Sequence, residues 1–219
     1  MTGRLVLVRE GFGEAGSLES LVARVARDLG VNPDPIASLQ SIRVAVTNAQ
    51  SALKAVEIAA RYSPDAVLVT ADCDDDCPRD LAPTIAAALR ARAFPFPVAV
   101  VLFYREYETL ALSVAGELDG VELISTKGTV IVRMSLTGAP PTDPEAHRDA
   151  KGWISRNLFG GTSYKPTLHQ RPLTARLLLA DLGEADLSSY RRLRTAVGFL
   201  ADQMNAGSAG AYPPASAGS

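Results

Sequence analysis

The chain has 219 residues, of which 47% are hydrophobic and 21% charged, and a formal net charge of −2. These values are typical of an ordinary soluble globular protein that is long enough to bury one full core. No apolar run approaches the roughly 20 residues of a membrane-spanning helix, and Met1 is followed by a strand-like segment rather than a signal peptide. We therefore expect a cytoplasmic protein that does not contact a membrane.

Strand-like and helix-like segments alternate along the first half of the chain. Four nearly continuous apolar runs predict buried strands, at residues 5–8, 42–46, 65–72 and 98–103. Segments with apolar residues at helical spacing predict helices at 17–30 (with Ser17 as N-cap), 49–62, 79–92 and 106–115. Strands of this kind, separated by helices, favour a parallel sheet that is covered on both faces.

The pattern changes after about residue 116. We predict two further strands at 121–124 and 129–134, and helices at 143–154, 174–182 and 188–204. The tail from 207 onward has small residues and prolines but little to bury, so we expect it to be disordered. The predicted organisation is an α/β core over 1–116, an α+β extension packed on it over 117–204, and a disordered tail over 205–219.

Charge is distributed unevenly along the chain. Lys and Arg number 13 against 19 Asp and Glu over residues 1–146, but 9 against 4 over residues 147–194. The basic region could contact phosphates or an acidic partner, or it could simply be a solvated face. Cys73 and Cys77 are too close in sequence to make a useful disulfide staple, so we expect them to be reduced. With only His147 and His169 to complete a site, the sequence does not favour structural zinc.

Acidic residues follow three of the predicted strands. Glu10 follows the first, Glu106 follows the fourth, and after the third comes a cluster that includes Asp72, Asp74 and Asp76. Because parallel strands deliver their carboxyl ends to one edge of a sheet, we expect these acids to meet there. Hard carboxylate oxygens suit Mg²⁺ or Mn²⁺. The alternative for the cluster is a solvated acidic turn at a helix N-terminus.

A glycine motif follows the first strand. Gly11, Gly13 and Gly16 fit the dinucleotide-binding spacing G-x-G-x-x-G. Glu10 and Glu14 would place negative charge beside a pyrophosphate, and the second strand lacks the acid that would bind the ribose. We instead interpret Gly11 and Gly13 as positions where a bulky phosphodiester could approach the acids.

The combination of Glu10-Gly11 after the first strand with Asp72 and Asp74 after the third resembles the toprim domain of topoisomerases, primases and certain nucleases. The chain is closer to a family of uncharacterised prokaryotic toprim-like proteins, the domain of unknown function numbered 4276. That resemblance covers about residues 4–200, and its motifs are Glu10 to Glu14, Asp72 to Pro78, Arg105 to Glu108, Asp149 to Trp153 and Ser189 to Leu193. It implies a toprim-like, Rossmann-like fold with a helical C-terminal extension.

The resemblance also implies a mechanism. Glu10 would act as general acid/base, and Asp72 and Asp74 would hold Mg²⁺ or Mn²⁺ for the hydrolysis of DNA or RNA. We add Asp76 and Glu106 as candidate metal ligands, and Glu10 could help to bind the metal instead of activating the attacking water. Phe12, His169 and Gln170 depart from the expected pattern, and no tyrosine is a persuasive topoisomerase nucleophile.

Two features concern substrate and partners. Lys151 and Arg156 could neutralise a phosphate backbone, although Lys151 could equally form a salt bridge with one of the site acids. Related toprim proteins often work beside an ATPase in phage-defence systems, so the resemblance implies an ATPase partner, and the sequence leaves a homo-oligomer open. The alternative to a nuclease is a non-catalytic partner or regulatory subunit of such an ATPase complex.

Overall fold

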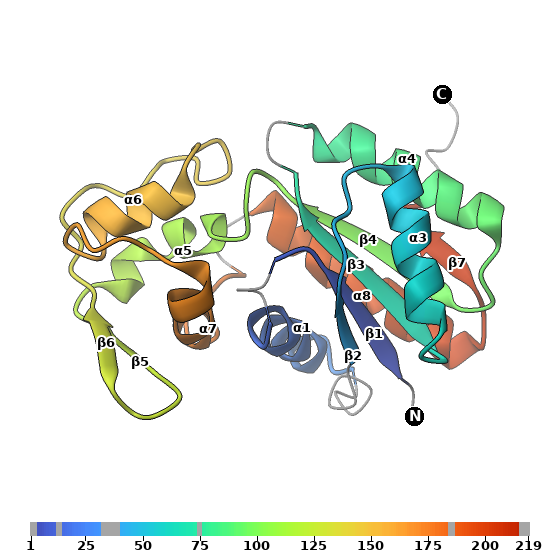
Figure 1. Cartoon of the computed structure of the whole chain (residues 1–219), viewed down its shortest axis with the longest axis horizontal. Helices are drawn as coiled ribbons and strands as arrows, with labels where there is room; N and C mark the ends of the chain where they lie inside the picture. The colour runs from blue at the N-terminus through green and yellow to red at the C-terminus, as the bar shows by residue number, and fades with distance from the viewer. Residues whose placement is uncertain (1–3, 12–14, 32–39, 74–75, 184–186, 215–219) are drawn as a thin grey trace.

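The computed structural model describes residues 4–11, 15–31, 40–73, 76–183 and 187–214 (Figure 1). Its centre is a sheet of five parallel strands in the order β2-β1-β3-β4-β7. The strands are β1 (Leu5–Arg9), β2 (Gln40–Arg43), β3 (Ala66–Asp72), β4 (Pro97–Phe103) and β7 (Gly210–Tyr212). The predicted α/β class with a parallel sheet is confirmed, and the arrangement is consistent with a Rossmann-like fold.

Two helix layers cover the sheet, and the alternation of side chains along each strand explains why. Leu5 and Leu7 of β1 pack into one hydrophobic cluster, whereas Val6 and Val8 pack into a second. The first cluster includes α1 (Ser17–Asp28) and α8 (Ser188–Ala206), and the second includes α3 (Ala49–Ala60) and α4 (Pro78–Arg92). Strands that are buried on both faces need continuous apolar runs, which is the pattern in the sequence.

The segment between β4 and α8 forms a lobe at the carboxyl ends of the strands, to the left of the sheet in Figure 1. It contains α5 (Thr109–Ser113), a 3₁₀ turn (Ala115–Leu118), the antiparallel pair β5 (Glu122–Ile124) and β6 (Val130–Arg133), α6 (Ala150–Asn157) and α7 (Pro166–Leu177). Buried residues of this lobe, such as Leu110, Trp153 and Leu173, belong to the same cluster as α1 and α8. The lobe is therefore packed onto the sheet rather than tethered to it.

Several predicted boundaries differ from the structure. The helix predicted over 143–154 begins only at Ala150, because the Asp149 carboxylate caps it by accepting a hydrogen bond from the Gly152 N–H at 2.8 Å. Helix α7 begins at Pro166 rather than 174, and it continues through Pro172. Residues before and after that proline both contribute to the buried face of the helix. Packing therefore outweighs the tendency of proline to break a helix.

Two helix N-termini are capped in ways that the sequence did not indicate. Gly16, in the left-handed region at φ 79°, is the N-cap of α1 in place of Ser17. The Glu145 carboxylate caps α8 from a distant loop, accepting hydrogen bonds from the Ser188 N–H (2.8 Å) and the Ser189 N–H (2.7 Å). Burial alone would raise the pKa of Glu145, but these hydrogen bonds outweigh it and lower the pKa.

The segment predicted to be a disordered tail contributes a strand. Residues 210–212 form β7, which pairs in parallel with β4 through Val98 and Ala211. Ala211 is buried, and the Tyr212 ring lies 5.9 Å from that of Phe199. The composition of the segment did not predict this strand, because its three residues are stabilised by contacts with β4 and α8 rather than by an apolar pattern of their own.

Candidate functional site

The sheet has a topological switch point between β1 and β3, where successive strand connections run to opposite sides. β1 connects through α1 to β2 on one side, whereas β3 connects through α4 to β4 on the other. In open parallel sheets, ligands bind beyond the carboxyl ends of the strands at such a switch point. Glu10 directly follows β1 and Asp72 is the last residue of β3, so the two acids lie at the same edge, on either side of the switch point.

The loop after β1 is held by two arginines that bind its main chain. Arg9 donates to the Gly11 carbonyl at 2.5 Å, and Arg43 of β2 donates to the Glu10 carbonyl at 3.0 Å. The Glu10 side chain is half-buried. The main chain that carries Glu10 is therefore held at the carbonyl groups of both Glu10 and Gly11.

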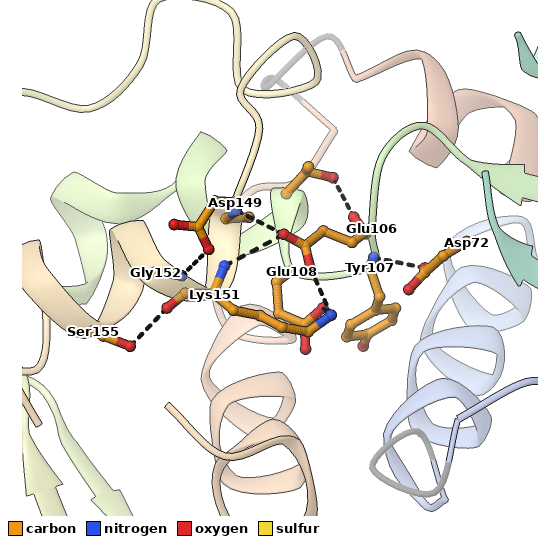
Figure 2. A network of polar contacts seen from close by, with 10 residues as sticks. Asp72, Glu106, Tyr107, Glu108, Asp149, Lys151, Gly152 and Ser155 are labelled. Atoms are coloured by element: carbon orange, nitrogen blue, oxygen red, sulfur yellow. Dashed lines mark hydrogen bonds and ion pairs between the residues drawn. The ribbon is translucent and has the colours of Figure 1, made fainter. Parts of the chain in front are cut away.

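The Asp72 carboxylate is oriented by the segment that follows β4. Its Oδ1 accepts a hydrogen bond from the Tyr107 N–H at 2.9 Å, as Figure 2 shows. Tyr107 is buried, its ring packs edge-on against Phe103, and its hydroxyl lies 2.8 Å from Thr174 Oγ1 on α7. Two separate contacts, to Phe103 and to Thr174, therefore fix the residue that orients Asp72.

Glu106 is engaged by α6. Its Oε1 accepts hydrogen bonds from the N–H groups of Ala150 (2.6 Å) and Lys151 (3.4 Å), and its Oε2 lies 2.5 Å from the Lys151 ammonium. Both carboxylate oxygens thus bind protein donors, and the role of Glu106 as a metal ligand stays a prediction. Of the two roles expected for Lys151, the structure contains the salt bridge to a site acid.

Glu108 lies deeper in the same cluster (Figure 2). Its side chain is 2% exposed, and its Oε2 lies 3.4 Å from the Lys151 ammonium. Burial raises the pKa of Glu108, and the nearby ammonium offsets part of that effect. Burial by itself would lower the pKa of Lys151, but the charge of Glu108 and the hydrogen bond to Glu106 raise it overall, so this lysine stays protonated.

The hydroxyl of Tyr164 faces this cluster. It is buried and makes no hydrogen bond of regular geometry, yet it lies near enough to Glu108 that burial and the Glu108 carboxylate both raise the pKa of the phenol. The ring packs against Phe159 and His169. Tyr164 is therefore a buried neighbour of the Glu108 carboxylate.

Glu108→Gln should change how stability depends on pH. Because the pKa of Glu108 is raised in the folded state, its contribution to stability is fully present below about pH 4.5 and is lost as pH rises through the folded pKa. The free energy of unfolding of the wild type relative to the variant should therefore fall as pH increases above 4.5. Urea unfolding of both proteins at several pH values from 4 to 8 measures this difference. A difference that grows with pH would contradict the raised pKa.

The remaining candidate residues are placed as follows. Asp76 is exposed on the acidic turn, where its N–H binds the Cys73 carbonyl at 2.8 Å. Arg156 is exposed on α6 and lies 3.4 Å from the Asp149 carboxylate. Gly11 lies beside Glu10, whereas Asp74 and Gly13 lie outside the described residues.

The sequence did not identify Tyr107 as part of the site, because its contribution is a backbone N–H that any residue type could supply. The sequence places Glu108 only at the end of the Arg105 to Glu108 motif, and its deep burial depends on α6 and the Tyr164 segment folding over it. An available signal was the position of Tyr107 between two acids directly after a strand. Burial of the Tyr107 ring brings the neighbouring Glu106 and Glu108 toward the interior of the protein.

The carboxylates of Glu10 and Asp72 are oxygen ligands of the kind that a divalent cation binds. Among the described residues, no group of three or more His, Cys, Asp or Glu side chains is arranged to hold a metal ion. Mg²⁺, however, commonly keeps several waters and takes only one or two protein carboxylates. Glu10 and Asp72 supply ligands of that type at one edge. Cys73 and Cys77 are both free thiols, the first buried and the second exposed.

Comparison of the chain with protein-family models, with curated proteins and with solved structures found no match in any of the three. In the part of the chain that the structure describes, no helix has the length and hydrophobicity needed to cross a membrane.

Proposed function

We propose that this chain is a Mg²⁺- or Mn²⁺-dependent nuclease of toprim type that hydrolyses phosphodiester bonds of DNA or RNA. The observation that carries the proposal is the placement of Glu10 and Asp72 on either side of the switch point at the carboxyl edge. A site of carboxylates in that position suits a cation that offsets the charge of a phosphodiester.

Each residue has a role in this proposal. Asp72, together with Asp74, holds the cation, which when bound would polarise the scissile phosphate and stabilise the leaving oxygen. Glu10 accepts a proton from the attacking water and returns one to the leaving oxygen. Arg156, exposed on α6, contributes positive charge to the path of the nucleic-acid backbone.

In this proposal the Lys151 ammonium lines the site beside Glu106 and Glu108. It neutralises part of the charge of Glu106 and Glu108, so that the acids beside Asp72 do not repel the incoming phosphate as strongly. An ATPase partner, as in the phage-defence systems that the sequence resemblance suggests, would be the natural regulator of such a nuclease.

The test is cleavage of single- and double-stranded DNA and RNA by the purified protein, with Mg²⁺, Mn²⁺ or EDTA. We expect cleavage with either metal and none with EDTA. Titration of Mn²⁺ by calorimetry supplies a second readout that does not depend on finding the right substrate. Failure to bind Mn²⁺ or to cleave any substrate would reject the nuclease and favour the non-catalytic partner of an ATPase.

A further inference from the structure

A continuous series of contacts runs from α6 to the proposed metal ligand Asp72. Lys151, in the first turn of α6, holds Glu106 and Glu108 by their carboxylates. Tyr107 lies between these two acids in sequence, and its N–H binds Asp72 Oδ1. The lysine thus fixes the residues on both sides of the group that orients Asp72 (Figure 2).

The backbone in this segment needs such support. Arg105, immediately before Glu106, has a positive φ of 67°, which is uncommon for a residue with a side chain. Glu108 is placed where burial alone would disfavour its charged form. Conformations of this kind persist when neighbouring contacts fix them, and α6 supplies such contacts to Glu106 and Glu108.

We propose that Lys151 is a positioning residue for the metal site: by holding Glu106 and Glu108, it keeps the Tyr107 N–H on Asp72 and so sets the orientation in which that carboxylate meets the cation. This inference rests on the proposed function and adds the means by which the lobe controls metal affinity. Residues that orient a metal ligand commonly change metal affinity 10- to 100-fold when they are removed.

The direction in which Mn²⁺ affinity changes distinguishes a positioning role of Lys151 from a purely electrostatic one. A lysine near a metal site repels the cation, so removing its charge would by itself strengthen metal binding. Removing a positioning residue instead weakens binding, because Asp72 is no longer held in one orientation. Lys151→Met keeps the apolar stem and removes the ammonium, whereas Lys151→Arg keeps the charge and can still bridge two carboxylates.

The experiment measures Mn²⁺ affinity by calorimetry and exchange of the Tyr107 amide hydrogen by NMR. For Lys151→Met we expect affinity to fall on the order of 10-fold and the protection of the Tyr107 amide to fall by a similar factor. Lys151→Arg should restore both to within a few-fold of wild type. Lys54→Met, which removes an exposed lysine from α3, should leave both unchanged.

The outcomes distinguish the two proposals. Unchanged or tighter Mn²⁺ binding by Lys151→Met would overturn the positioning role while leaving the metal site in place. Tyr107→Phe, which is charge-neutral and removes the hydroxyl contact to Thr174, should also weaken Mn²⁺ binding, and an affinity equal to that of the wild type would count against the positioning role. Absence of Mn²⁺ binding by the wild type would overturn the proposed function and the inference together.

Discussion

Asp72→Asn should reduce metal-dependent cleavage by more than about 100-fold and weaken Mn²⁺ binding in parallel. Loss of a ligand should cost at least as much as the 10- to 100-fold commonly lost with an outer-shell partner. The Asn side chain keeps a carbonyl oxygen that can accept the Tyr107 N–H, so the local fold should be retained. The variant therefore removes charge from the ligand without removing its anchor. Cleavage rates and calorimetric titration of Mn²⁺ are the two measurements.

The matched control is Asp80→Asn. Asp80 is an exposed acid in the first turn of α4, so this change removes one negative charge from the same edge of the sheet without touching Glu10 or Asp72. We expect near wild-type cleavage and Mn²⁺ binding. Equal activity of Asp72→Asn and wild type would exclude Asp72 from the site, and equal losses in both variants would indicate a general effect of charge.

Glu10→Gln separates proton transfer from metal binding. If Glu10 acts as general acid/base, cleavage should fall by about 10²- to 10⁴-fold while Mn²⁺ binding stays within a few-fold of wild type. If Glu10 is a ligand, both should fall together. Because its loop is held through main-chain carbonyls by Arg9 and Arg43, the substitution should leave the loop in place.

Leu68→Ala should have the largest effect on stability. Leu68 lies in β3, is fully buried, and belongs to the cluster shared by the sheet, α1 and α8. Truncating a leucine in such a position costs about 3–5 kcal/mol of unfolding free energy through lost burial and the cavity left behind. For a domain of this size the midpoint of thermal unfolding should fall by about 6–20 °C. Urea and thermal unfolding measure both quantities.

Leu179→Ala is the control of identical chemistry. Leu179 is 77% exposed, so the change should alter unfolding free energy by no more than about 0.5 kcal/mol. A small effect at Leu68 would mean that β3 is not the packed centre of the sheet. A large effect at Leu179 would mean that this exposed side chain is covered by something else in solution.

The sheet and its flanking helices could be predicted because they depend on local patterns. Continuous apolar runs such as residues 98–103 predict strands that are buried on both sides, and β4 occupies Pro97–Phe103. The placement of Glu10 and Asp72 at one edge follows from strand direction alone. It needs no knowledge of side-chain contacts.

The features that the sequence did not reveal depend on contacts between distant segments. The Asp149 cap that starts α6 competes with an equally plausible start at Asp143, and local preference does not decide between them. The sequence left two partners open for Lys151, a phosphate backbone or one of the site acids, and only the folded chain brings its ammonium and backbone N–H to Glu106, 45 residues away. β7 formed from a segment whose composition indicates disorder, because β4 offers a partner for its backbone.

The position of α8 and β7 in the chain affects how the molecule assembles. β4 ends at Phe103, yet the helix that covers one of its faces begins at Ser188 and the strand at its edge begins at Gly210. Until these segments are present, that face of β3 and β4 and the open edge of β4 are exposed to water and to other chains. Contacts between such distant segments slow folding, and exposed apolar strands promote aggregation. During synthesis, the emerging sheet would therefore depend on chaperones or on rapid completion of the chain, and variants that weaken α8 should lower soluble yield more than their equilibrium stability indicates.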